Sequence, residues 1–251
     1  MDLRLPDDGP SHPFEAARDR FESACDLDLP VEVRLRDDPD ARTWAGHYDD
    51  HHVLNISRRA ASSAMAPELA LHEYAHMCRY EQRHPSHTQS IDEAVMLAFP
   101  GRSVERQKLL HCAQIANHMK DVYADDITLR VGPADKLAAF FESELAGAVA
   151  DRPSAPPAKG WTRLTPGADP DITAINAAFA VALLERHDAL PDDHRLYEFA
   201  HVAARDAPGV DLSGFKRRFR ELVRDPNESE FRKALVDAAR AYVLPDEQAA
   251  D

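Results

Sequence analysis

Lysine is scarce in this chain of 251 residues, and arginine supplies most of its positive charge. The lysines are Lys108, Lys120, Lys136, Lys159, Lys216 and Lys233. The formal net charge is −14 and the pI is about 5.3. A surface of this sign opposes binding to nucleic-acid backbones and to anionic membranes. We therefore expect no nucleic acid and no membrane as partners.

Long apolar runs are also missing. No run approaches the roughly 18 residues that cross a bilayer, although a hydrophobic fraction of 44% is ample for a packed core. The chain starts Met-Asp-Leu-Arg, without a basic segment followed by an apolar stretch, so no secretion signal is expected. These absences predict a cytoplasmic location. The acidic, lysine-poor composition is similar to that of proteins from salt-loving archaea, so a halophilic protein is expected.

Cysteine occurs at Cys25, Cys78 and Cys112. The odd number and wide spacing fit neither a disulfide framework nor a C-x-x-C metal knuckle. Free thiols in a reducing compartment are therefore expected. Cys78 follows His76 by two residues, which on a helix turns its side chain about 200° away from that histidine. A packing role is expected for Cys78.

The most informative motif is H-E-x-x-H, formed by His72, Glu73 and His76. Residues four apart project from the same face of a helix, so both imidazoles can reach one metal ion. Neutral imidazole binds zinc well, and zinc lowers the pKa of a bound water to about 7. Glu73 can take a proton from that water and pass it to a leaving amine. The motif predicts a zinc-dependent peptidase with Glu73 as its catalytic base.

The residues around the motif favour this interpretation. They are uncharged, as expected where a helix is buried beside a metal: Ala70, Leu71, Tyr74, Ala75, Met77 and Cys78. Roughly 0.04 accidental matches are expected per sequence of this length and composition. The plainer alternative is an ordinary helix whose two histidines are merely neighbours.

Hydrophobic periodicity predicts a short sheet followed by helices. Before the motif we expect a helix over 13–25, a strand over 31–35, and a hairpin with strands over 43–48 and 52–56. Pro67 opens the motif helix, with Ser62 or Ser63 as candidate caps. A polar loop follows at 83–87, and Ser90 caps the next helix. Later helices are expected over 90–99, 103–129, 134–149, 171–187, 191–205, 211–224 and 228–243.

A catalytic zinc takes three protein ligands and leaves one position open. In the extended motif H-E-x-x-H-x-x-G-x-x-H, the glycine and third histidine would stand where this chain has Arg79 and Gln82, which excludes the metzincin pattern. The better source is the helix over 103–129. At 100° per residue its polar side chains gather within about 80° of one another. They are His111, Gln114, His118, Asp121 and Asp125.

A second helix with two acids four residues apart, after H-E-x-x-H, resembles the gluzincins, the thermolysin-like zincin peptidases. The resemblance covers roughly residues 30–130. It implies that Asp121 is the third zinc ligand, beside His72 and His76. It also implies that Asp125 hydrogen-bonds a ligand histidine, which fixes the tautomer and orientation of that ring.

One departure from that class concerns the third ligand. Asp121 stands where glutamate is usual, and its side chain is shorter by one methylene, so the second helix must come closer by about 1 Å. Some zincins use aspartate here, with an asparagine four residues earlier, as Asn117 stands in this chain. Asp125 and His118 are the alternative third ligands.

Amide hydrolysis places negative charge on the carbonyl oxygen, and a tyrosine, histidine or arginine commonly helps to stabilise it. The sequence does not choose among the candidates, which are Tyr74, His87, His111, Tyr123, Tyr197 and His201. The resemblance further implies that strand 52–56 lies at the edge of the cleft and pairs with an extended peptide.

The sequence thus predicts an α+β protein of zincin type, with a small N-terminal β-sheet, two metal-bearing helices and a mostly helical C-terminal half. The expected domains are a catalytic domain over 1–150, a linker over 151–160 and a helical subdomain over 161–251. The expected activity is hydrolysis of peptide or protein substrates with Zn²⁺ as cofactor. Two alternatives stay open: a non-catalytic protein-binding module with a structural metal, and hydrolysis of a non-peptide amide.

Overall fold

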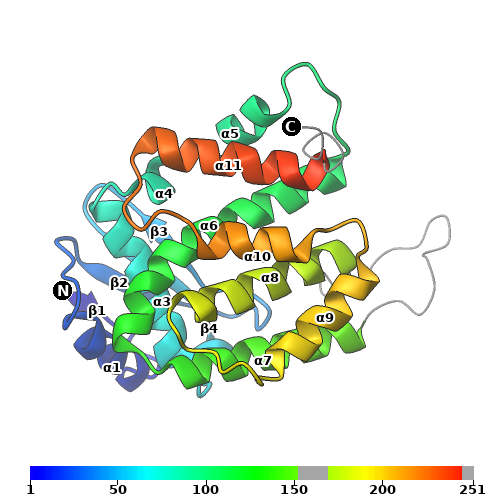
Figure 1. Ribbon diagram of the computed structural model, residues 1–251. Coiled ribbons are helices and arrows are strands. Elements are labelled where there is room, and N and C mark those ends of the chain that lie inside the picture. Colours follow the sequence, from blue (N-terminus) through cyan, green and yellow to red (C-terminus); the bar gives the residue numbers. More distant parts are fainter. Residues whose placement is uncertain (152–168, 245–251) are drawn as a thin grey trace. The chain divides into compact units, whose positions relative to one another are not determined.

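The computed structural model describes residues 1–151 and 169–244 (Figure 1). The α+β prediction is confirmed, because a small sheet near the N-terminus is followed by a mostly helical chain. Within the described residues, no helix is both long and apolar enough to cross a membrane.

The chain forms two compact units. The first comprises residues 1–88 and 120–133, and the second comprises residues 89–119 and the chain from 134 onward. Helix α6 (Arg106–Val131) contributes residues to both units. The predicted linker, 151–160, lies outside the described residues except for Asp151, and the domain division placed there stays a prediction.

The sheet of the first unit has the order β1-β2-β4-β3. Its strands are β1 (Leu3–Arg4), β2 (Val31–Arg36), β3 (Trp44–His47) and β4 (His52–Ser57). β4 is parallel to β2 and antiparallel to β3, so the predicted hairpin is confirmed. Because β4 lies between two strands, its backbone groups are used within the sheet. The prediction that residues 52–56 pair with a substrate at the sheet edge is therefore wrong; β3 forms that edge.

The helices of the first unit differ from prediction mainly at their ends. Besides the end of α6 they are α1 (His12–Phe21), α2 (Arg58–Ala61), α3 (Ala66–Glu81) and α4 (Pro85–Thr88). The residue before α3 is Met65, and Pro67 stabilises the first turn through its fixed φ, so Ser62 and Ser63 are not its N-caps. α2 was not predicted, and α4 occupies most of the expected loop at 83–87.

The apolar face of α3 packs into the core of the first unit, and this packing holds the helix in place. Phe14 and Phe21 of α1 are buried, and the ring of Phe21 packs edge-on against Tyr74 of α3 at 5.9 Å between centroids. Truncating such an aromatic side chain costs about 3–5 kcal/mol. Because this face is buried, the orientation of the opposite face of α3, from which both motif histidines project, is also set.

A disulfide joins Cys25 to Cys78, which corrects the expectation of free thiols. The bond links the chain after α1 to the C-terminal half of α3 across 53 residues of sequence. Wide spacing in the sequence does not prevent this pairing, because α1 and α3 pack against each other. Cys112 is a free, buried cysteine. Cys78 is buried, as expected for a packing role, and its sulfur is engaged in the disulfide.

The described part of the second unit is helical. Beside the first part of α6 it contains α5 (Ile91–Ala98), α7 (Ala134–Ala150), α8 (Pro170–Arg186), α9 (Leu196–Asp206), α10 (Leu212–Arg220) and α11 (Glu228–Val243). Each was predicted to within a few residues. Capping side chains fix where two of these helices begin. At the start of α5 the Ser90 hydroxyl accepts the Glu93 backbone N–H, and at the start of α11 Asn227 forms a capping box with Glu230.

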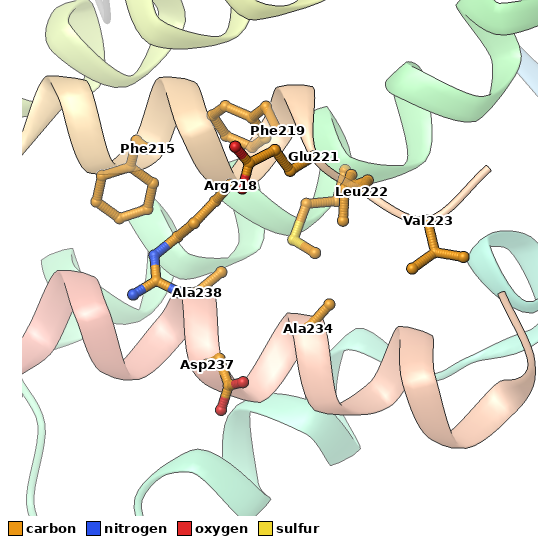
Figure 2. A pocket seen from close by; sticks show the side chains of 10 residues that line it. Phe215, Arg218, Phe219, Glu221, Leu222, Val223, Ala234, Asp237 and Ala238 are labelled. Atoms are coloured by element: carbon orange, nitrogen blue, oxygen red, sulfur yellow. The ribbon is translucent and has the colours of Figure 1, made fainter.

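A hollow of about 220 Å³ lies in the second unit between α10 and α11 (Figure 2). Apolar side chains dominate its walls, among them Phe215, Phe219 and Leu222, and Arg218 and Asp237 stand beside them. Its described lining includes no histidine or cysteine, so it lacks the nitrogen and sulfur ligands that zinc prefers. The candidate metal centre lies in the first unit.

Candidate metal centre

The H-E-x-x-H segment lies within helix α3, as predicted. His72 and His76 occupy successive turns on one face, and their rings meet edge-on with centroids 4.6 Å apart. Both side chains are partly accessible, with 30% and 15% exposure. The helix therefore presents two imidazoles outward from a buried backbone.

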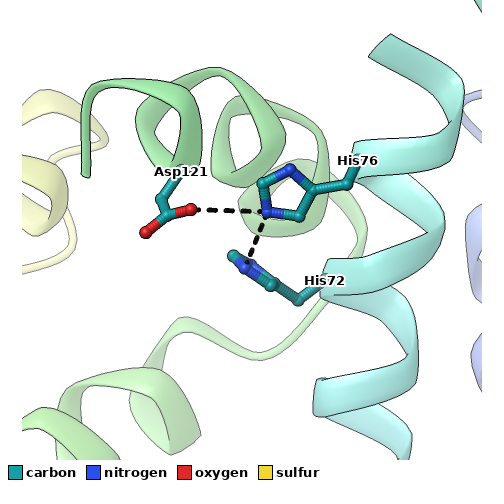
Figure 3. Close-up of side chains that lie close together, drawn as sticks. All are labelled: His72, His76 and Asp121. Atoms are coloured by element: carbon teal, nitrogen blue, oxygen red, sulfur yellow. Dashed lines mark hydrogen bonds and ion pairs between the residues drawn. The ribbon is translucent and has the colours of Figure 1, made fainter. Parts of the chain in front are cut away.

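Asp121 of α6 approaches both rings (Figure 3). Nε2 of His72 lies 3.0 Å from Nε2 of His76, which lies 3.4 Å from Oδ1 of Asp121. One ligand atom from each of the three residues lies within 4.8 Å of the others. The structure thus brings together the three side chains that the sequence analysis proposed as zinc ligands.

Asp125 contacts the outer nitrogen of His72. Nδ1 of His72 lies 2.8 Å from Oδ1 of Asp125, which also accepts the Thr128 hydroxyl at 2.8 Å. An ionised carboxylate only accepts hydrogen bonds, so Nδ1 of His72 carries a proton and donates. In the neutral ring Nε2 is then the lone-pair nitrogen, and it faces His76 and Asp121.

The carboxylate of Asp125 also favours the protonated form of His72. Burial lowers the pKa of His72, but the charge and hydrogen bond of Asp125 outweigh it and raise that pKa to about 10. A charged His72 would carry a proton on Nε2, which lies 3.0 Å from Nε2 of His76. A metal cation between these nitrogens would replace that proton.

Glu73 is held next to the histidine pair. It is 8% exposed, and the backbone of Ala45 in edge strand β3 favours its ionised form. Burial raises the pKa of Glu73, while His72 and His76 oppose that rise. A carboxylate with a raised pKa is suited to accept and return a proton near neutral pH.

His87 contacts the outer nitrogen of His76, a relationship the sequence analysis missed. Its Nε2 lies 2.8 Å from Nδ1 of His76. Burial, then the proximity of His76, lower the pKa of His87 to about 2, so its ring is neutral at pH 7. The sequence analysis offers His87 as a group that stabilises charge on the substrate, and the structure places its ring against His76.

A second histidine group in the first unit was also missed. Glu81 accepts the backbone N–H groups of Asp28 and Leu29 at 2.8 and 2.9 Å, and its Oε1 lies 3.0 Å from Nε2 of His52. Nδ1 of His52 lies 3.1 Å from Nδ1 of His47. Carboxylate and rings thus form one chain of hydrogen bonds that ends at His47.

His47 faces α3 from the edge strand. Its ring stacks on Tyr80 with 4.1 Å between centroids. Burial, followed by His52 and His76, lowers the pKa of His47 to about 4. The predicted hairpin could have revealed this pair of histidines. His47 and His52 are directly paired across β3 and β4, so they share one face of the sheet.

The alternative third ligands are engaged elsewhere. Asp125 contacts the Nδ1 side of His72, opposite the nitrogen that faces Asp121. Nε2 of His118 lies 2.8 Å from Oδ1 of Asn176, and its ring stacks on Phe179 at 4.3 Å, all within the second unit. Neither belongs to the group of described residues that could hold a metal.

Most of the other candidates for stabilising charge on the substrate have partners of their own. Tyr74 is buried in the first-unit core, and its hydroxyl donates to the carbonyl of Phe14 at 3.4 Å. Tyr123 is buried, with its ring against His84. The remaining candidates are in the second unit: His111 bonds Tyr242, Tyr197 bonds Glu185, and His201 is exposed. None of these five lies in the His-His-Asp group.

Fold and site together define a mixed α+β protein with a His-His-Asp candidate metal centre. The chain belongs to a family of unknown function, DUF5781, whose model matches residues 1–244. A comparison with curated proteins finds no match. The function proposed below therefore rests on the geometry and chemistry of the first unit.

Proposed function

We propose that this protein is a zinc-dependent metallopeptidase of the zincin type. The observation that carries the proposal is the convergence of His72, His76 and Asp121, with Glu73 adjacent in the same motif. Two imidazoles and one carboxylate are the ligand set of many catalytic zinc sites. The substrate class is a peptide or protein.

The three donors fit a zinc ion in type and spacing. Tetrahedral zinc with bond lengths of about 2.0–2.1 Å separates its ligand atoms by about 3.3 Å. The ligand nitrogens are 3.0 Å apart, and that of His76 lies 3.4 Å from the carboxylate oxygen of Asp121. The lone-pair nitrogen of His72 also points to this group, because Asp125 holds the proton on its other side.

Zinc bound by these donors would supply a water molecule whose pKa is about 7 and would polarise the substrate carbonyl. Glu73 would take up a proton released by water and hold it on its carboxylate. The C–N bond breaks as Glu73 returns the proton to the departing amine.

The number of donors favours an enzyme over a structural metal site. A structural zinc has four protein ligands, whereas a catalytic zinc has three and an open position. The described residues provide three grouped donors, His72, His76 and Asp121. A structural site also has no use for Glu73 beside it. A non-catalytic binding module and a non-peptide amidase remain the competing proposals.

A cytoplasmic location and a halophilic origin also remain proposals. The acidic, lysine-poor composition supports the halophilic origin. The disulfide between Cys25 and Cys78 opposes a reducing compartment, because intracellular thiols of mesophiles are normally reduced.

The experiment that tests the function compares wild type with Glu73→Gln. Glutamine keeps the shape of the side chain but cannot accept a proton, so this variant should bind zinc normally and lose peptide cleavage. Cleavage of a mixed library of short peptides, followed by mass spectrometry, provides the assay. The exposed Glu144→Gln serves as the matched control and should cleave like wild type. Retained cleavage by Glu73→Gln, or no cleavage by zinc-loaded wild type, would contradict the proposal.

A further inference from the structure

We propose that His87 is a positioning residue of the metal centre, and that a hydrogen-bond chain through Ser86 and His84 fixes the proton of His76 on Nδ1. The inference deepens the proposed function, on which it rests, by explaining how the second ligand histidine presents its lone pair. All groups in the chain lie in the first unit.

The chain of hydrogen bonds starts at a backbone amide, whose N–H can only donate. The N–H of Ser86 donates to Nδ1 of His84 at 3.2 Å, so that nitrogen is unprotonated. The hydroxyl oxygen of Ser86 lies 2.7 Å from the same nitrogen. Because that nitrogen only accepts, the Ser86 hydroxyl must donate its one proton to His84.

The directions of the remaining hydrogen bonds follow one from another. The Ser86 oxygen has given its proton, so it accepts from Nδ1 of His87 at 2.8 Å. The ring of His87 contacts a hydroxyl and an imidazole, and neither carries a negative charge that would hold a second proton on it. With its proton on Nδ1, its lone pair is on Nε2, which lies 2.8 Å from Nδ1 of His76. His76 therefore donates from Nδ1 and keeps the lone pair on Nε2, the nitrogen that faces His72 and Asp121.

The way in which α3 ends brings His84, Ser86 and His87 close to His76. Arg83 has a φ of 51°, and its N–H and that of His84 bond back to the carbonyls of Tyr80 and Arg79 at 2.9 Å. This is a Schellman ending, which reverses the chain after the helix. The short helix α4 then runs beside α3, and the His84 ring packs against Tyr123 with centroids 4.6 Å apart. Ser86 is fully buried, so water does not compete for its hydroxyl.

The two ligand histidines are thus oriented by different chemistry. His72 is held by the carboxylate of Asp125, and His76 by a neutral ring. Partners of this kind contribute about 10- to 100-fold to metal affinity in other sites. A role confined to packing would leave metal affinity unchanged whenever the substituted side chain filled the same space.

The first test measures zinc affinity in competition with a chromophoric chelator. His87→Leu removes the acceptor and should weaken binding by about 10- to 100-fold, with a matching change in the visible spectrum of the Co²⁺-substituted protein. His87→Gln offers an amide oxygen as an acceptor and should retain most of the affinity. Ser86→Ala should weaken binding less than His87→Leu. Thr88→Ala, which removes a hydroxyl from the same short helix outside the chain, should match wild type.

The second test needs no metal. Nitrogen-15 NMR of the histidine rings in the metal-free protein identifies which nitrogen carries each proton. The proposal predicts Nδ1–H for His76 and for His87, and Nε2–H for His84. The opposite tautomer at His76 or His87 would overturn it, and so would equal zinc affinity of His87→Leu and wild type. If wild type bound no zinc, the proposed peptidase would fail, while the ring tautomers would still decide this inference.

Discussion

Nδ1 of His72 lies 2.8 Å from Oδ1 of Asp125, one helical turn after Asp121 on the same helix. One helix therefore supplies both a candidate ligand and the group that orients another ligand. The Thr128 hydroxyl donates to the same carboxylate oxygen and restrains it. Helix α6 can hold the metal centre together only if the turn from Asp121 to Asp125 keeps its position against α3.

Asp125→Asn should weaken zinc binding by about 10- to 100-fold. The amide is neutral, so it no longer stabilises the proton on Nδ1 of His72, and its NH₂ group can face that ring instead. Zinc affinity measured by chelator competition checks the prediction. Asp135→Asn, the same change at an exposed position, is the matched control. An affinity within twofold of wild type would show that the Asp125 carboxylate does not support the ligand.

Thiol counting should find one free cysteine in the unreduced, unfolded chain and three after reduction. The pair Cys25 and Cys78 is joined, whereas Cys112 is free but buried in the folded state. Reduction should also lower the free energy of unfolding by about 2–4 kcal/mol, because a loop of 53 residues is released. A thiol reagent added in denaturant gives the count, and urea titration gives the stability. Three reactive thiols without reduction would rule out the disulfide in the isolated protein.

Glu185→Gln should destabilise the protein at pH 7 by about 1–2 kcal/mol. Burial alone would raise the pKa of Glu185, but hydrogen bonds from Lys216 and Tyr197, aided by Arg220, lower it. The distances are 2.9, 3.0 and 3.1 Å, respectively. A carboxylate whose pKa is lowered by folding adds stability above its unfolded pKa, and that stability is lost as pH falls through the folded value.

The difference between Glu185→Gln and wild type should therefore shrink on going from pH 7 to pH 3. Urea unfolding at several pH values measures it. The exposed Glu198→Gln should show no such trend. A difference that stayed constant across this range would mean that the ionised form of Glu185 does not stabilise the fold.

Local pattern was enough to predict most helices and the candidate ligands. The H-E-x-x-H spacing places His72 and His76 on one face of any helix, whatever surrounds it. The same argument groups Asp121 with Asp125 on α6. The structure brings His72, His76 and Asp121 within reach of one another, although whether they bind zinc remains a prediction.

Other features depend on contacts that local pattern does not contain. The pairing of Cys25 with Cys78 requires knowing that α1 packs on α3. The contact between His87 and His76 requires the reversal at Arg83, where a left-handed residue ends the helix without the glycine that usually signals it. Strand β4 was wrongly taken as an edge because the order of strands follows from the whole sheet.

The zinc content of wild type beside Asp121→Ala tests the central claim most directly. Both proteins are loaded with zinc, dialysed against metal-free buffer and analysed for metal per chain. Wild type should retain about one zinc and Asp121→Ala close to none, because two imidazoles alone leave a catalytic site one ligand short. A wild type without zinc, or an Asp121→Ala variant that retains a full equivalent, would contradict the three-ligand centre.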